Sequence, residues 1–231
     1  IWCDGPRLYR ETEEWLVREQ DPTPVTAYYS LQVASLGDDP HPDIICTMQS
    51  ATWVMYGGGA GAWRPLEATA LPGVRSLLAD IDGDGQLEAL GCICGYFYSE
   101  GRVAVIDLAT GTAEWTDTAS SAFMGAGQLD ADAALELVLG TTDGPGRILD
   151  GASHQQQWSY PDGFRGRPAF GNFRGSATSL EFAIVQAWGP AKVFVSQPIF
   201  SPVADLETGQ VNSFDVLDVN ADGNDDLVVG E

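Results

Sequence analysis

Two loops in this sequence place oxygen-bearing side chains at alternate positions, an arrangement that can wrap a hard cation. One loop runs from Asp80 to Glu88 and the other from Asp218 to Asp226. Calcium takes about six to eight oxygen ligands at short range. A glycine at the sixth position of each loop allows the sharp turn that such wrapping needs. The predicted ligands are Asp80, Asp82, Asp84, Gln86, Glu88, Asp218, Asn220, Asp222, Asn224 and Asp226.

The segments on either side of the two loops predict strands rather than helices. An EF-hand loop begins in the same way, but it needs a bidentate glutamate at position 12 and a helix on each side. Position 12 here is Gly91 or Val229, and the neighbouring segments are short and apolar or alternate between apolar and polar residues. Such patterns are typical of β-strands. The sequence therefore predicts calcium loops that connect strands.

Two further segments keep part of the pattern. Residues 128–136 keep Asp130, Asp132 and Glu136 but lack the glycine, so we predict a third calcium site that binds more weakly. Residues 35–43 keep oxygen side chains at positions 5 and 9, and we predict that they bind little calcium.

The remaining copy, the fourth along the chain, carries a positive charge where the two complete loops carry an oxygen ligand. It starts at Asn172, has Arg174 at its third position and contains one extra residue before Glu181. We predict that the guanidinium stands in for the cation and pairs with Glu181 or a neighbouring carboxylate. This loop is therefore predicted to bind no calcium.

The five loops recur at a nearly constant interval. Their first positions fall at 35, 80, 128, 172 and 218, which are 45, 48, 44 and 46 residues apart. An aromatic residue closes each of the first four repeats: Trp63, Trp115, Trp158 and Phe200. A period of this size built from strands is typical of a β-propeller with one repeat per blade. We predict an all-β propeller of five blades with about four antiparallel strands each, and the three tryptophans are expected to be wedged between blades.

The two ends of the chain complement one another. The 34 residues before the first loop and the 14 from Asp218 onward make 48, which is one repeat length. We predict that residues 1–34 and 218–231 share a blade and close the ring, so that residues 1–231 form a single domain without a free sheet edge. The alternative is that the chain is a fragment of a larger propeller with seven or eight blades.

The charge and composition of the chain indicate which partners and which cellular location are expected. The net charge is −22 with a single lysine, which disfavours nucleic acid and anionic membrane surfaces as partners. No apolar run is long enough to insert into a membrane, and the chain starts at Ile1 as a mature product or an excised domain does. Calcium loops this open have dissociation constants of about 10⁻⁴–10⁻³ M, so we predict an extracellular, cell-surface, secreted or periplasmic protein.

The four cysteines are interpreted as buried thiols or cross-blade disulfides, and their pairing is left open: Cys3, Cys46, Cys92 and Cys94.

The loops and the strands that follow them resemble a known repeat. Residues 80–91 and 218–230 are similar to the FG-GAP/VCBS repeats of integrin α-subunit propellers and of many secreted bacterial proteins. Phe170 and Gly171 resemble the FG part of the repeat, and the glycine-rich segment 57–61 resembles the GAP part. The resemblance implies Ca²⁺ in the loop between the first and second strands of a blade, where it braces that blade. The family includes adhesion receptors, lectin-like modules and enzyme-associated domains.

Candidate partner-binding residues lie outside the calcium loops. Arg165 and Arg167 are interleaved with phenylalanines in a stretch without acids, which indicates either an anion- or glycan-binding patch or arginine stems that cover a core. The less periodic aromatic residues Trp53, Tyr96, Tyr98 and Trp188 are further candidates.

The residues favour a calcium-binding extracellular propeller that acts as a protein- or glycan-binding adhesion module, alone or in a larger assembly. The sequence contains no nucleophile elbow, no phosphate-binding loop and no histidine pair in metal-binding register. An enzyme is therefore not expected. The alternative is a polysaccharide-active enzyme, or an enzyme-associated domain, with a site on one propeller face.

Overall fold

The computed structural model describes residues 2–4, 7–10, 13–16, 28–36, 41–48, 52–55, 63–65, 75–93, 102–108, 110, 112–117, 123–140, 144–175, 180–186, 190–195, 200–206, 211 and 213–230. All regular secondary structure in these ranges is β-strand, which confirms the predicted all-β class. No helix among them could span a membrane.

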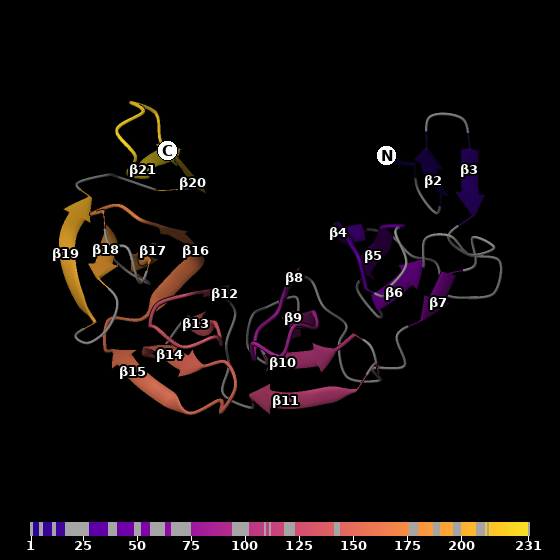
Figure 1. Cartoon of the computed structure of the whole chain (residues 1–231), viewed down its shortest axis with the longest axis horizontal. Coiled ribbons are helices and arrows are strands. Elements are labelled where there is room, and N and C mark those ends of the chain that lie inside the picture. The colour runs from indigo at the N-terminus through magenta and orange to yellow at the C-terminus, as the bar shows by residue number, and fades with distance from the viewer. Residues whose placement is uncertain are drawn as a thin grey trace. The chain divides into compact units, whose positions relative to one another are not determined.

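The strands form sheets in which strands that follow one another in the sequence lie side by side (Figure 1). The first sheet holds β1 (Trp2–Asp4), β2 (Arg7–Arg10) and β3 (Glu13–Leu16). The second holds β4 (Tyr28–Ala34), β5 (Asp43–Met48), β6 (Thr52–Met55) and β7 (Trp63–Pro65). The third holds β8 (Arg75–Ala79), β9 (Glu88–Ile93), β10 (Arg102–Asp107) and β11 (Ala113–Asp117).

The second half of the chain continues this order. The fourth sheet holds β12 (Phe123–Gly127), β13 (Glu136–Gly140), β14 (Gly146–Asp150) and β15 (Gln156–Tyr160). The fifth holds β16 (Phe164–Gly171), β17 (Glu181–Gln186), β18 (Ala191–Val195) and β19 (Ser201–Leu206). The last is the hairpin of β20 (Ser213–Leu217) and β21 (Asp226–Gly230). The predicted pattern of about four antiparallel strands per repeat is confirmed for the second to fifth sheets, and the number of five blades stays a prediction.

The chain folds into two compact units. One comprises Ile1–Leu78, Gln86–Ile93 and Ala104–Thr116, and the other comprises Ala79–Gly85, Cys94–Val103 and Asp117–Glu231. Within the second unit, the first strands of successive sheets are neighbours, because β12 contacts β16 and β16 contacts β20. Sheets whose first strands line up in this way are the blades of a propeller.

Aromatic side chains fill the space between the fourth and fifth sheets. Phe182 and Phe194 stack with ring centroids 4.9 Å apart, and Phe164 packs edge-on against both rings. Trp158 lies 5.7 Å from Phe194 and 5.5 Å from Phe200. The predicted position of Trp158 as a wedge between blades is therefore confirmed. Burial of several large aromatic side chains is a major source of stability in a sheet protein of this kind.

The other unit has a smaller cluster of its own. Ala89, Ala104, Ile106 and Leu108 are buried together. Leu36, Leu78 and Leu87 pack against them, and each lies in or next to one of the first two repeat loops. The loops are therefore attached to the sheets by apolar contacts as well as by the strands that they join.

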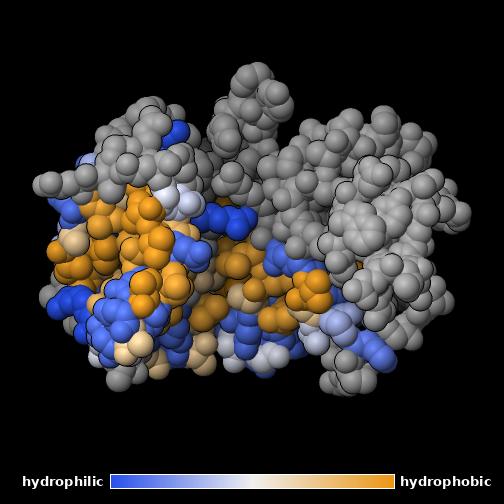
Figure 2. Space-filling model, turned by 90° about the horizontal axis from the view of Figure 1, so that it is seen from above, coloured by the Kyte–Doolittle hydropathy of each residue, from blue (hydrophilic) through white to orange (hydrophobic). Residues whose placement is uncertain are grey.

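The last hairpin keeps hydrophobic side chains at its surface. Figure 2 shows orange hydrophobic residues among blue hydrophilic ones on the visible face, and the exposed large hydrophobics include Leu217, Val219 and Val228. Two strands with exposed apolar side chains are expected of a blade that lacks its outer strands. The shared blade of residues 1–34 and 218–231 stays a prediction.

Candidate metal centre

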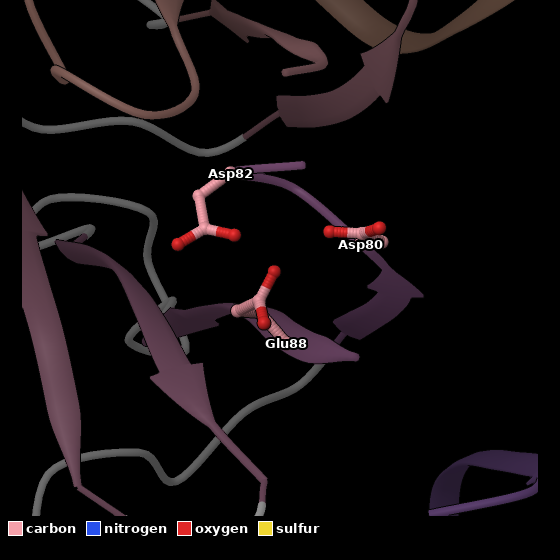
Figure 3. A group of neighbouring side chains, drawn as sticks. All are labelled: Asp80, Asp82 and Glu88. Carbon is pink, nitrogen blue, oxygen red and sulfur yellow. The ribbon is translucent and has the colours of Figure 1, made fainter. Parts of the chain in front are cut away.

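The loop after β8 gathers three carboxylates. Asp80, Asp82 and Glu88 each offer an oxygen within 4.8 Å of the others, and Figure 3 shows the three side chains around a common space. Glu88 is buried, and the two aspartates are half-buried. The other two predicted ligands of this loop, Asp84 and Gln86, are exposed and lie outside the group.

Backbone hydrogen bonds hold the position-1 aspartate of this loop. The amides of Gly83 and Gly85 donate to the two carboxylate oxygens of Asp80 at 2.9 and 3.0 Å. Both glycines have positive φ, 80° and 92°, a conformation that other residues rarely adopt. The loop lies between the first and second strands of its sheet, which is the position that the sequence predicts.

The loop after β12 forms a second group of three. Asp130, Asp132 and Glu136 also place oxygens within 4.8 Å of one another. Glu136 is fully buried, and its Oε2 accepts a hydrogen bond from the Leu129 amide at 2.5 Å. Its other oxygen, Oε1, has no hydrogen-bond partner among the described residues.

This arrangement makes the charge on Glu136 costly. Burial is the main cause that raises the pKa of Glu136 to about 7; the hydrogen bond from Leu129 opposes the shift, and Asp130 and Asp132 add to it. A buried carboxylate with one unpaired oxygen and two acidic neighbours gains most from a cation. The donor set of this loop therefore fits a bound metal ion.

The loop after β20 is built differently although its motif is complete. Asp218 accepts hydrogen bonds from the amides of Asp222 and Gly223 at 3.1 and 2.9 Å. The amide group of Asn220 donates to Asp222 at 3.0 Å, and both of these side chains are exposed. Hydrogen bonds from the Asn224 amide and from Asn220 lower the pKa of Asp222.

The acids of this last loop do not form a group like the other two among the described residues. Asp226 at position 9 instead accepts a hydrogen bond from the Val219 amide at 2.9 Å, and Asn224 is half-buried. Its role as a calcium loop therefore stays a prediction.

One hydrogen bond recurs in four of the five loops and defines their register. The amide at position 2 donates to the carboxylate at position 9, seven residues later, in Leu36–Asp43, Leu129–Glu136, Arg174–Glu181 and Val219–Asp226. By this bond the fourth loop starts at Phe173, one residue later than the side-chain pattern predicts, and it contains no extra residue.

This register also shows which atom of Arg174 contacts Glu181. Its backbone amide, not its guanidinium, contacts Glu181, at 3.2 Å. The residue itself is exposed. The role of the guanidinium as an internal substitute for a cation stays a prediction.

The loops of successive blades in the second unit are linked through their backbones. Leu135 N donates to Ile81 O at 2.8 Å, Leu180 N to Gln128 O at 3.0 Å, and Asp225 N to Asn172 O at 3.0 Å. In each case the amide at position 8 donates to a carbonyl within one residue of position 1 of the preceding loop. The loops are therefore fixed relative to one another, which keeps the carboxylates in place.

The predicted partner-binding residues are only partly described. Arg165 and Arg167 are exposed on β16, on either side of Gly166 with φ of 80°, where the register with β17 shifts. Trp53 lies on β6, but its side chain is outside the described part. Tyr96, Tyr98 and Trp188 lie outside the described residues. The same holds for Cys94 and for the side chains of Cys3, Cys46 and Cys92.

Gln157 is a site residue that sequence reasoning missed. It lies on β15, and its Nε2 is 3.2 Å from Oδ2 of Asp130, 27 residues earlier. It lies outside the third loop, on the last strand of the same sheet, so loop spacing gives no signal for it. Its place directly before the repeat-phase Trp158 is the one feature of the sequence that could have drawn attention to it.

Comparison with known proteins supports the fold. No protein-family model matches the sequence, and no curated protein matches it. Among solved structures, BBS1N in complex with ARL6DN is similar at a TM-score of 0.55 and 12% identity, over 82% of this chain and 58% of that one. The Dos1 propeller is similar at a TM-score of 0.55 and 13% identity, over 82% of this chain and 50% of that one. The chain thus spans less than two thirds of each of these structures, and it has the β-propeller fold.

Proposed function

We propose that this chain is a calcium-binding β-propeller of the FG-GAP/VCBS type that acts as an interaction module. The observation that carries the calcium assignment is Glu136, a fully buried carboxylate with an unpartnered oxygen beside two further acids. Two unit charges 4.8 Å apart repel by about 3 kcal/mol at an effective dielectric constant of about 20. A divalent cation removes this repulsion and satisfies the oxygen.

The chemistry of the two carboxylate groups favours calcium over other metals. Asp80, Asp82 and Glu88 offer only oxygen, as do Asp130, Asp132 and Glu136. Zinc prefers nitrogen and sulfur ligands, whereas all-oxygen sets suit hard cations. Magnesium demands a tighter octahedron than a flexible loop readily supplies. Calcium bound there would hold the start of each loop to the first residue of the following strand.

The setting that fits these sites is extracellular, and the partner class that fits the fold is a protein. Open loops of this kind have dissociation constants of about 10⁻⁴–10⁻³ M, which suit calcium outside the cell. The similar propeller BBS1N was crystallised in complex with ARL6DN, which favours a protein over a glycan as the partner of this chain. A net charge of −22 favours a basic contact surface on that partner.

Calcium binding is tested by calorimetric titration of four proteins. We expect saturable binding to the wild type and the loss of one site each in Asp82→Asn and Asp130→Asn. The control is Asp215→Asn, which removes an exposed acid of β20 outside the loops and should leave binding unchanged. Equal binding by all four proteins would overturn the assignment.

The partner class is tested separately by capture of surface proteins on the calcium-loaded chain and by a glycan array. Calcium-dependent capture of a defined protein with a blank array is the expected result. Binding to the array with no protein captured would instead identify a lectin.

A further inference from the structure

The third loop lacks the position-1 carboxylate that takes part in the group after β8. The equivalent residue is Gln128, and its amide is used by its own loop. Its Nε2 donates to the Asp132 carbonyl at 2.6 Å, and its Oε1 accepts from the Asp130 amide at 3.3 Å. Gln128 therefore braces the loop, and one oxygen of the cation shell has to come from elsewhere.

Gln157 lies where that oxygen is needed. Its amide is 3.2 Å from the Asp130 carboxylate, which itself belongs to the group with Asp132 and Glu136. The Oε1 atom of Gln157 is buried and has no hydrogen-bond partner among the described residues, and the same is true of Oε1 of Glu136. Two unpartnered buried oxygens thus belong to side chains that flank the same carboxylate.

The orientation of the amide explains why its oxygen is unpartnered. Next to a carboxylate, a glutamine turns its NH₂ group toward the negative charge. With a cation on that carboxylate, rotation of the amide by a half turn exchanges the two ends and presents the oxygen instead. The rotation requires no movement of β15.

We propose that Gln157 is a ligand of the cation in the third loop, where its side-chain oxygen takes the place of the missing position-1 carboxylate. This inference rests on the proposed calcium function. The residue is neutral, so the third loop has the three charges of Asp130, Asp132 and Glu136, whereas residues 80–88 carry four acids. Calcium affinity follows the number of charged ligands, which makes the third loop the weaker site.

The test isolates the third loop in a background in which Asp80 and Asp218 are changed to alanine. Calcium dissociation constants are measured by calorimetry with calcium chloride, and thermal unfolding in chelator checks that every variant is folded. Gln157→Leu is expected to weaken binding about tenfold or more, the size of effect seen when a residue around a metal is lost. The control is Gln156→Leu, an exposed neighbour on the same strand, which should bind like the background.

Gln157→Glu separates a ligand from a residue that only orients Asp130. A glutamate keeps the oxygen and adds a charge, so a ligand role predicts tighter binding. If the NH₂ group were what mattered, the glutamate would repel Asp130 and weaken binding as much as leucine does, and this result would overturn the proposal.

The failure of this inference and the failure of the calcium function give different results. If Asp130→Asn weakens binding but Gln157→Leu stays within about twofold of the background, the inference is wrong and the calcium site stands. If the background binds no calcium at all, the third loop is not a cation site and both are overturned.

Discussion

Replacing Gly83 by alanine tests whether the second and third loops are packed as the structure shows. A Cβ atom at this position would lie 2.8 Å from the carbonyl carbon of Ala133 and 2.9 Å from its Cβ. Neither atom is the end of a flexible side chain, so the backbone itself must move. Gly85 in the same loop has nothing within 4 Å of its Cβ position. It therefore serves as the matched control.

The expected loss in the free energy of unfolding has two contributions. Left-handed backbone costs a non-glycine residue about 1–2 kcal/mol, and both positions incur this cost because their φ angles are 80° and 92°. Forcing an extra carbon into packed surroundings costs about 1–3 kcal/mol more, and only Gly83→Ala incurs that. Because the φ of Gly85 is the less favourable for alanine, any excess at Gly83 comes from the contact with Ala133.

The assay is thermal unfolding in chelator, so that changes in calcium affinity do not enter. The excess of about 1–3 kcal/mol corresponds to a melting temperature about 2–12 °C lower for Gly83→Ala than for Gly85→Ala in a chain of this size. Equal melting temperatures would refute the packing of the two loops and, with it, the backbone link between Ile81 and Leu135.

Three further predictions concern charge and packing. In the calcium-free protein, the raised pKa of Glu136, about 7 against 4.5, means that the folded state keeps a proton that the unfolded chain loses. The free energy of unfolding should therefore fall by about 3 kcal/mol as the pH rises from 4.5 to 7, and Glu136→Gln should show a smaller fall in urea titrations at each pH. Phe182→Ala should lower the free energy of unfolding by about 3–5 kcal/mol, because the ring is fully buried against Phe194; a loss below 1 kcal/mol would contradict the packing. Arg147→Ala should destabilise the chain more than the double variant with Asp117→Ala does relative to wild type, because it removes the ion-pair partner of a buried carboxylate; single-variant effects that simply add up in a double-mutant cycle would show that the pair contributes nothing.

The repeat period was enough to predict the order of strands, because strands that follow one another in the sequence also lie side by side in each sheet. Each loop joins the first and second strands of a sheet, and Trp158 fills the space between two sheets, as their positions in the period indicate. The start of the fourth loop was off by one residue for a physical reason. Asn172 resembles a ligand, whereas the feature that fixes the register is a main-chain hydrogen bond to Glu181 that the side-chain pattern does not reveal.

The completeness of a loop motif did not predict in which loops the carboxylates lie close together. The loop from Asp218 has every expected oxygen, yet Asp218, Asn220 and Asp222 are exposed and the side chains of Asn220 and Asp222 bond to each other. In the incomplete loop from Gln128 the acids lie close together, and Glu136, the first residue of β13, is buried in the sheet. Gln157 could not be found from loop spacing, because it lies on β15, at the opposite edge of the sheet from β12, and contacts Asp130 from there.

Calcium binding by the repeat loops is tested most directly by thermal unfolding, first in chelator and then with calcium titrated to about 10 mM. A parallel titration uses magnesium. At ten to a hundred times its dissociation constant, each occupied site should add about 1.4–2.7 kcal/mol of stability. If these loops bind calcium, the melting temperature should rise saturably by several degrees with calcium and by less with magnesium. An unchanged melting temperature, or the same rise with both ions, would contradict the assignment of these loops as calcium sites.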